Sequence, residues 1–183
     1  MSLFRRFLRQ QRASAAIELA LISVFFLVPL FIGALDFVLV LTAQAQLNTA
    51  LQALYYFAVT TPASAANNTT AGYVINAINT ANGSSINQLS LPATTTSAIK
   101  LGSTSIPAGT ANPSTYYACY TTPASSSSTS FSSVTYQSSA CGSSQTQQVY
   151  VIYQVTGHVS LPVPLPGRGS TISLSASGSI QTQ

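Results

Sequence analysis

Apolar residues form one long block near the start of the chain, from Ala13 to Leu41. Inside this block, no ionisable side chain stands between Glu18 and Asp36. A helix needs about 20 mostly apolar residues to cross the roughly 30 Å hydrocarbon core of a bilayer. The block is longer than that, so the pattern predicts a helix that spans a membrane.

The helical pattern continues past the block, where it becomes amphipathic. Apolar residues recur there at helical spacing with polar residues between them, and the apolar set is Leu47, Leu51, Leu54, Tyr55 and Ala58. One helix over Ser14–Ala58 would be about 68 Å long at 1.5 Å per residue, so its second half must leave the bilayer. Thr60–Pro62 is expected to end it, and a shorter helix is expected over Ala71–Ala81 after a polar loop.

The end of the chain has a two-residue period instead. Apolar side chains occupy odd positions in Gln148–Val163, and in Ser170–Gln181 they alternate with serines. This period is typical of a strand with one buried face. Joined by a turn at Pro162–Gly169, the two segments predict an antiparallel hairpin whose apolar face covers the amphipathic helix.

Charge is scarce and unevenly placed. Charged residues make up 4% of the 183, and four of the six basic residues precede the apolar block, namely Arg5, Arg6, Arg9 and Arg12. Basic residues beside a first span hold that end in the cytoplasm, so the long C-terminal part is expected outside it. Because the leader carries most of the net charge of +4, no basic patch remains to suggest nucleic acid as a partner.

Together these elements predict an α+β fold in which a long N-terminal transmembrane helix continues into a small antiparallel β-sheet domain. Residues 1–13 are interpreted as a basic leader and residues 14–58 as the helix, which spans the membrane in its first half. Residues 59–183 are expected to form an extracytoplasmic, β-rich domain with Ser/Thr-rich loops. Short apolar pieces within it predict short strands, at Leu89–Leu91, Ala98–Leu101 and Tyr116–Tyr120.

The residues around the start of the apolar block resemble a known class of signal. The chain reads RASAAIELAL from Arg12 to Leu21, then Pro29 within the apolar run, then IGALDF from Ile32 to Phe37. This is similar to the class III signal of the type IV pilin superfamily, in particular that of the TadE-like pilus proteins. Their pattern is R-G-S/A-A-A-V-E-F-A-L, an apolar stretch with a proline, and F-G-x-x-E-F-G.

The resemblance implies a pilin-like fold and a role as a minor pilin or pseudopilin of a Tad-type, type IV-like pilus. A prepilin peptidase would cleave between Ala13 and Ser14, and the subunit would then sit in the bacterial inner membrane. Its implied partners are other pilin subunits and a membrane assembly platform with a cytoplasmic ATPase. The chain departs from the pattern at Ala13 and Val38, where the family has glycine, and at Leu19, where it has an aromatic residue.

Glu18 is the candidate assembly residue, because an unpaired carboxylate inside the membrane would cost several kcal/mol. Cleavage after Ala13 would create an ammonium group on Ser14, one helical turn before Glu18. Within one chain the pairing geometry is poor, but between neighbouring helices each charge can neutralise the other. Asp36 also falls where the family has an acid and is expected as a second polar contact. The alternative is that Glu18 only marks the interfacial edge of the span.

The remaining candidate residues indicate structure rather than catalysis. Cys119 and Cys141 are the only cysteines, and outside the cytoplasm such a pair predicts a structural disulfide that closes a Ser-rich loop. Only His158 could join them at a metal, so no metal site is expected. The outer domain has no acidic residue to orient His158 as a catalytic base. No enzyme activity, cofactor or small-molecule substrate is therefore expected.

Two other functions fit parts of the pattern. Ala43-Gln44-Ala45 is an A-x-A sequence, so the chain could be a secreted adhesin or binding domain whose ordinary signal segment is cut after Ala45. The apolar core is, however, longer than the 7 to 15 residues usual in such signals, and it carries two acids. An adhesin or an enzyme held by an uncleaved anchor is the other possibility, and the outer sequence shows no polar pocket for catalysis.

Overall fold

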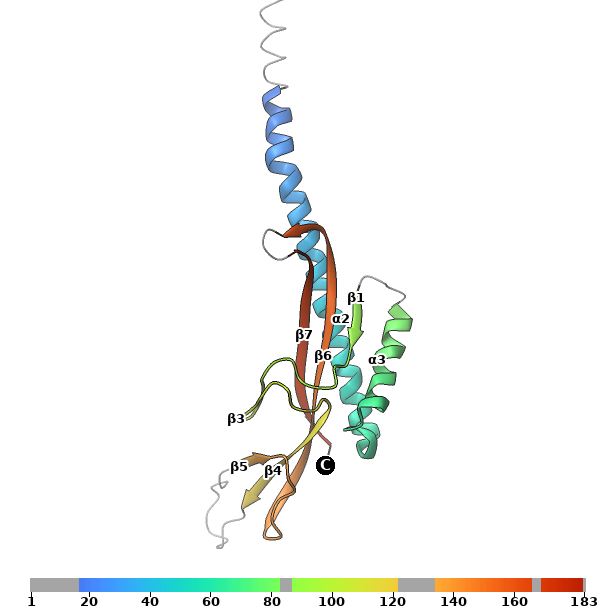
Figure 1. Ribbon diagram of the computed structural model, residues 1–183, viewed down its shortest axis with the longest axis vertical. Helices are drawn as coiled ribbons and strands as arrows, with labels where there is room; N and C mark the ends of the chain where they lie inside the picture. The colour runs from blue at the N-terminus through green and yellow to red at the C-terminus, as the bar shows by residue number, and fades with distance from the viewer. Residues whose placement is uncertain (1–16, 83–86, 122–133, 166–168, 183) are drawn as a thin grey trace, which may run out of the picture.

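The structure is a computed structural model that describes residues 17–82, 87–121, 134–165 and 169–182. Its dominant feature is a single helix of 44 residues, Ile17–Thr60. Figure 1 shows that the second half of this helix lies along a sheet, while the first half projects beyond every other described element. The predicted long helix is thus present, and it ends at the Thr60–Pro62 boundary.

The projecting half contains a local change of helix type. Residues 17–22 are α-helical, Ser23–Leu27 form a π-helical segment (η1), and the α-helix then continues as α2, Val28–Thr60. The backbone N–H of Val28 bonds to the carbonyl oxygen of Ser23, five residues earlier. Pro29 has no N–H to donate, so the regular ladder of hydrogen bonds is interrupted at this turn. The irregularity therefore has a local cause in the sequence.

A short helix follows α2 and packs beside it. After a 3-10 turn at Pro62–Ser64 (η2), helix α3 runs over Asn68–Asn82. The side-chain oxygen of Asn67 accepts hydrogen bonds from the backbone N–H groups of Thr69 and Thr70, at 2.9 and 3.4 Å. This capping starts the helix three residues before the predicted Ala71, in a stretch predicted to be loop.

The sheet is built around one long strand, β6. Strand β6 spans 21 residues and pairs antiparallel with β4 and β1 along one edge and with β7 along the other. Strand β5 pairs with β4, which gives the order β1-β6-β4-β5. A separate two-stranded sheet joins β2 and β3. The strands are β1 Asn87–Ser90, β2 Ile99–Leu101, β3 Thr104–Ile106, β4 Ser114–Thr121, β5 Val134–Gln137, β6 Gln145–Leu165 and β7 Gly169–Gln181.

The predicted C-terminal hairpin is confirmed, and it is longer than expected. Pairing of β6 with β7 runs from Tyr150 opposite Gln181 to Leu165 opposite Gly169, with an irregularity after Ser160. The strands therefore continue into the stretch predicted as the turn, of which residues 166–168 lie outside the described part. The short strands expected near residues 89, 99 and 116 correspond to β1, β2 and β4.

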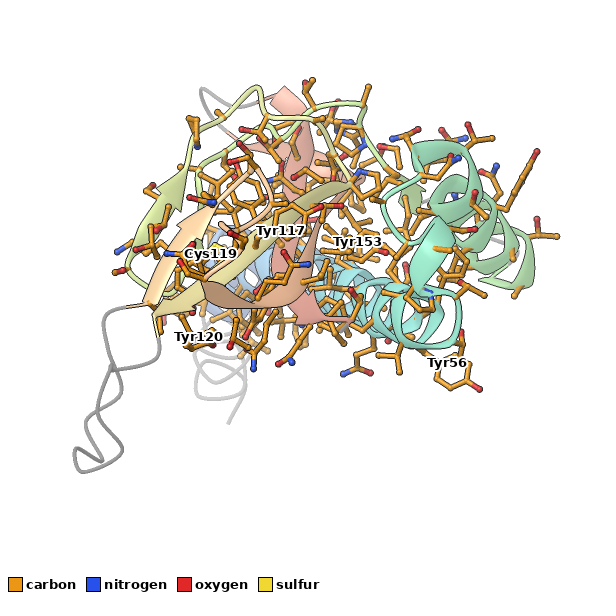
Figure 2. The ribbon with its side chains drawn as sticks, turned by 90° about the horizontal axis from the view of Figure 1, so that it is seen from below. Tyr56, Tyr117, Cys119, Tyr120 and Tyr153 are labelled. Carbon is orange, nitrogen blue, oxygen red and sulfur yellow. A yellow bond between two sulfur atoms is a disulfide. The ribbon has the colours of Figure 1, made fainter. Side chains whose placement is uncertain are left out.

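The main core lies between α2 and the odd-numbered face of β6, as the alternation predicted. Figure 2 shows Tyr153 between the sheet and the helices, whereas Tyr56 points outward from α2. The buried residues of this core come from both helices, the turn that joins them and three strands: Leu47, Ala50, Leu51, Leu54, Ala58, Ala65, Ala71, Ile75, Leu89, Val151, Tyr153, Val155 and Ala176. Burying their apolar surface is what holds the second half of the helix to the sheet.

On the other face of β6, Gln154 is buried, which the alternation of apolar and polar residues did not predict. Strand β4 pairs with β6 as far as Ile152, and β1 begins pairing at Thr156, which leaves Gln154 without a strand on that edge. The side chain of Asn112 fills the gap: its Oδ1 accepts from the Gln154 N–H at 2.9 Å and its Nδ2 donates to the Gln154 carbonyl at 2.8 Å. Both residues are almost fully buried. An amide side chain thus replaces a missing strand.

The predicted disulfide is also confirmed. Cys119 on β4 is bonded to Cys141, with their Cα atoms 5.5 Å apart. The bond ties β4 to the segment that leads from β5 into β6, at the end of the molecule opposite the projecting helix (Figure 2). The β2–β3 hairpin packs nearby through Ile99, Leu101 and Ile106 against Ile152, in a second apolar cluster bordered by tyrosines.

Candidate membrane and assembly surface

The projecting half of the helix exposes almost every large apolar side chain that it has. Fifteen large hydrophobic residues between positions 17 and 41 are exposed, with exposed fractions from 43% to 74%: Ile17, Leu19, Leu21, Ile22, Val24, Phe25, Phe26, Leu27, Val28, Leu30, Phe31, Leu35, Phe37, Val38 and Leu41. Soluble monomers rarely expose a continuous apolar patch of this kind. Removing these side chains from water, into lipid or against other helices, would be favourable by on the order of tens of kcal/mol.

The dimensions of this surface match a bilayer. Residues 17–41 form about 37 Å of helix at 1.5 Å per residue, compared with a hydrocarbon core of about 30 Å. The most apolar window of the helix has a mean hydropathy of 2.7, and none of that window is buried against the rest of the chain. The chain therefore has one helix, near its N-terminus, that is compatible with a single-pass membrane anchor.

Contact with the outer domain begins where the exposed surface ends. Ala43 is buried in a small apolar cluster with Val159 and Leu161 of β6, and Leu39 and Val40 border the same cluster. The helix thus passes from a free half to a packed half within about one turn. The end of the β6–β7 hairpin lies beside the helix at this transition (Figure 1).

Glu18 lies on the free half of the helix. Its side chain is exposed, and it has no hydrogen bond or ion pair with any residue that the structure describes. In hydrocarbon, such a carboxylate needs a proton, the head groups or a cation. Ala13 and Ser14, the proposed cleavage site, lie outside the described residues, so cleavage and pairing with Glu18 both stay predictions.

Asp36 lies in a different environment from Glu18, although the sequence analysis assigned both to assembly. It precedes Val40, which borders the cluster around Ala43, by one helical turn, and only 8% of its surface is exposed. Its Oδ1 is buried and has no hydrogen-bond partner among the residues that the structure describes. The side chain of Glu18 is therefore open to a neighbouring subunit, whereas the folded chain encloses that of Asp36. Its role as an assembly contact stays a prediction.

His158 has an exposed side chain on the even-numbered face of β6. Its Nδ1 lies 3.1 Å from the hydroxyl oxygen of Ser173 on β7. The only acids in the chain, Glu18 and Asp36, are on the helix, so the pair lacks the carboxylate of a catalytic triad. Among the described residues, no group of three or more His, Cys, Asp or Glu side chains could hold a metal ion.

The sequence analysis missed one polar surface. Helix α3, strand β1 and His158 border an open cleft, described below, that takes residues from three separate parts of the chain. Asn76, Asn79 and Gln88 appear in the sequence only as ordinary polar residues near a turn. A weak signal was present, because amide residues are frequent between positions 76 and 88.

Comparison with known proteins does not place the chain in a family: no protein-family profile, no curated protein and no solved structure matches it.

Proposed function

We propose that this protein is a TadE-like minor pilin or pseudopilin, a structural or assembly subunit of a Tad-type pilus. Its leader stays on the cytoplasmic side of the bacterial inner membrane, and the outer domain lies outside the cytoplasm. A prepilin peptidase removes residues 1–13, after which the subunit packs against other pilin subunits through the first half of its helix.

The observation that carries this proposal is the division of the helix into a free half and a packed half. Residues 17–41 expose their apolar side chains, and residues 43–58 are held by the domain's own core. The free half can therefore exchange lipid for the helices of other subunits while the outer domain stays folded. Because both environments are apolar, this exchange leaves most of the apolar surface out of water.

Glu18 supplies the register of that packing. A carboxylate with no partner among the described residues of its own chain remains available for a cation from another chain. Cleavage after Ala13 forms an ammonium group on Ser14, four residues before Glu18 in the sequence. If neighbouring subunits are displaced by about one helical turn along the helix axis, the Ser14 ammonium of one lies next to the Glu18 carboxylate of the other. Each charge then offsets the cost of burying the other.

The proposal is tested first by the mature N-terminus. Mass spectrometry of the protein from native membranes is expected to find a chain that begins at Ser14. A chain that begins at Met1 would contradict processing, and one that begins at Gln46 would identify the secreted alternative. That alternative also requires cleavage within α2, next to the buried Ala43.

The second test is incorporation into filaments. Glu18→Ala and Glu18→Gln both remove the charge, and we expect both variants to be processed normally but to be absent from sheared pili. Ser23→Ala is the matched control, because Ser23 is a small polar residue on the same free half of the helix, and it is expected to assemble normally. Incorporation of both Glu18 variants at the level of the control would refute the role of Glu18.

A further inference from the structure

An open cleft lies on the outer domain, away from the projecting helix. Its volume is about 580 Å³, and its lining comes from α3, β1 and β6: Asn76, Asn79, Thr80, Gln88, Leu89, Ser90 and His158. Ligand-binding clefts in proteins typically have volumes of about 300–1,000 Å³. The cleft is therefore large enough for a small molecule or part of a longer chain.

The walls of the cleft are held by side-chain hydrogen bonds. Asn79 donates from Nδ2 to the carbonyl oxygen of Leu89 at 2.8 Å and accepts at Oδ1 from the Leu89 N–H at 3.1 Å. The hydroxyl oxygens of Ser90 and Thr156 are 2.9 Å apart. These bonds join α3 to β1 and β1 to β6, and the contact between His158 and Ser173 links the third wall to β7. Polar groups held in this way lose little conformational freedom when a ligand binds.

The cleft offers hydrogen bonds but no charge. Six of the seven lining residues carry an amide, a hydroxyl or an imidazole, and Leu89 is the exception. Lys100 is the only Lys, Arg, Asp or Glu beyond α2 among the described residues, and it does not line the cleft. Among the described residues, the two bonds to Leu89 leave one N–H and one lone pair of the Asn79 amide unused. A matching ligand is therefore neutral and rich in groups that both donate and accept.

The hydrogen bonds between the Asn79 side chain and the Leu89 backbone disfavour binding of a peptide as an added strand. A strand that pairs with the outer edge of β1 needs the backbone N–H and carbonyl groups that point away from β6. At Leu89 both groups are already bonded to the Asn79 side chain. The main-chain recognition that gives peptides their affinity is thus blocked at the centre of the cleft.

We propose that this cleft binds a neutral carbohydrate, as a ligand that is held and not altered. Sugar hydroxyls donate and accept hydrogen bonds, as the amides and hydroxyls of the lining do. Each such bond replaces one to water, and the described residues of the lining include no aromatic ring to stack on a sugar face, so the affinity is weak, with a Kd of about 1 mM. This inference is independent of the pilus proposal, because the cleft belongs to the outer domain alone.

The test uses the full chain, labelled with ¹⁵N, in phosphocholine micelles, since a maltoside detergent would itself present sugar. Glucose, galactose and N-acetylglucosamine are titrated separately while NMR follows the side-chain amides of Asn76 and Asn79 and the imidazole of His158. We expect saturable shifts with at least one of these sugars. Glucosamine, gluconate and triglycine are titrated as cationic, anionic and peptide probes, and weaker binding is expected for each.

Two variants localise the binding. Asn76→Ala and Gln88→Ala alter exposed side chains with no hydrogen bond to another described residue, so the fold should be kept. Each is expected to weaken binding about fivefold through the loss of one hydrogen bond. The matched controls are Asn48→Ala and Gln52→Ala on the exposed face of α2, which should bind as the unmodified chain does.

Three results would overturn the proposal. The first is the absence of saturable shifts with all three neutral sugars. The second is equal or tighter binding of triglycine or of a charged analogue, which would identify a different class of ligand. The third is unchanged sugar affinity in both cleft variants, which would place the binding elsewhere on the chain.

Discussion

Removing the side chain of Asn112 is expected to destabilise the outer domain more than most substitutions of a polar residue. Asn112 is 1% exposed and donates from Nδ2 to two carbonyl oxygens, those of Pro92 at 2.9 Å and of Gln154 at 2.8 Å. It also accepts from the Gln154 N–H at 2.9 Å. Asn112→Ala would leave the N–H and carbonyl groups of a fully buried residue without partners.

The size of the effect follows from those two backbone groups. A buried donor or acceptor left unsatisfied costs about 1–3 kcal/mol, so the pair predicts a loss of about 2–6 kcal/mol. Asn79→Ala also breaks a pair of bonds to a backbone, but that pair is only partly buried, so water can replace the side chain and the loss should be nearer 1 kcal/mol. Asn48→Ala, on the exposed face of α2, should change stability by less than about 0.5 kcal/mol.

Chemical denaturation of the full chain in micelles, followed by tyrosine fluorescence, measures these losses. All nine tyrosines lie at or beyond position 55 and the chain has no tryptophan, so the signal comes from the outer domain rather than from the membrane half. The expected order of destabilisation is Asn112→Ala, then Asn79→Ala, then Asn48→Ala. If Asn112→Ala is no less stable than Asn48→Ala, the side chain does not act as a substitute strand.

Two further predictions concern the tyrosines of the main core. In Gly178→Ala, the new Cβ would overlap the hydroxyl oxygen of Tyr55, so thermal unfolding should show a loss of stability of about 1–3 kcal/mol, partly recovered by adding Tyr55→Phe. Burial raises the pKa of Tyr153 above its ordinary value of 10.0, while its hydroxyl donates to the Ala65 carbonyl oxygen at 2.7 Å. As the pH rises, the Tyr153 hydroxyl therefore ionises in the unfolded chain before it ionises in the folded one. The stability that this hydroxyl contributes below about pH 10 should be lost at higher pH. In alkaline denaturation curves, Tyr153→Phe should lose less stability above about pH 10 than the unmodified chain does.

The long helix and the C-terminal hairpin could be predicted because their signals are local. An apolar run with no charge between Glu18 and Asp36 determines how far a membrane helix extends, whatever the rest of the chain does. Alternation in β6 likewise assigns Val151, Tyr153 and Val155 to one face before any partner is known. The disulfide followed from having only two cysteines.

Tertiary structure alone decided the features that depend on residues far apart in the chain. The pairing of Asn112 with Gln154 joins residues 42 positions apart, and the cleft around His158 needs α3 and β1 at the edge of the sheet. Asp36 is another example. In the sequence, Glu18 and Asp36 are both isolated acids within the apolar block, but in the structure Asp36 is buried and Glu18 is exposed. Local periodicity records which side of an element is apolar, whereas the partners of a polar group depend on which elements the folded chain brings together.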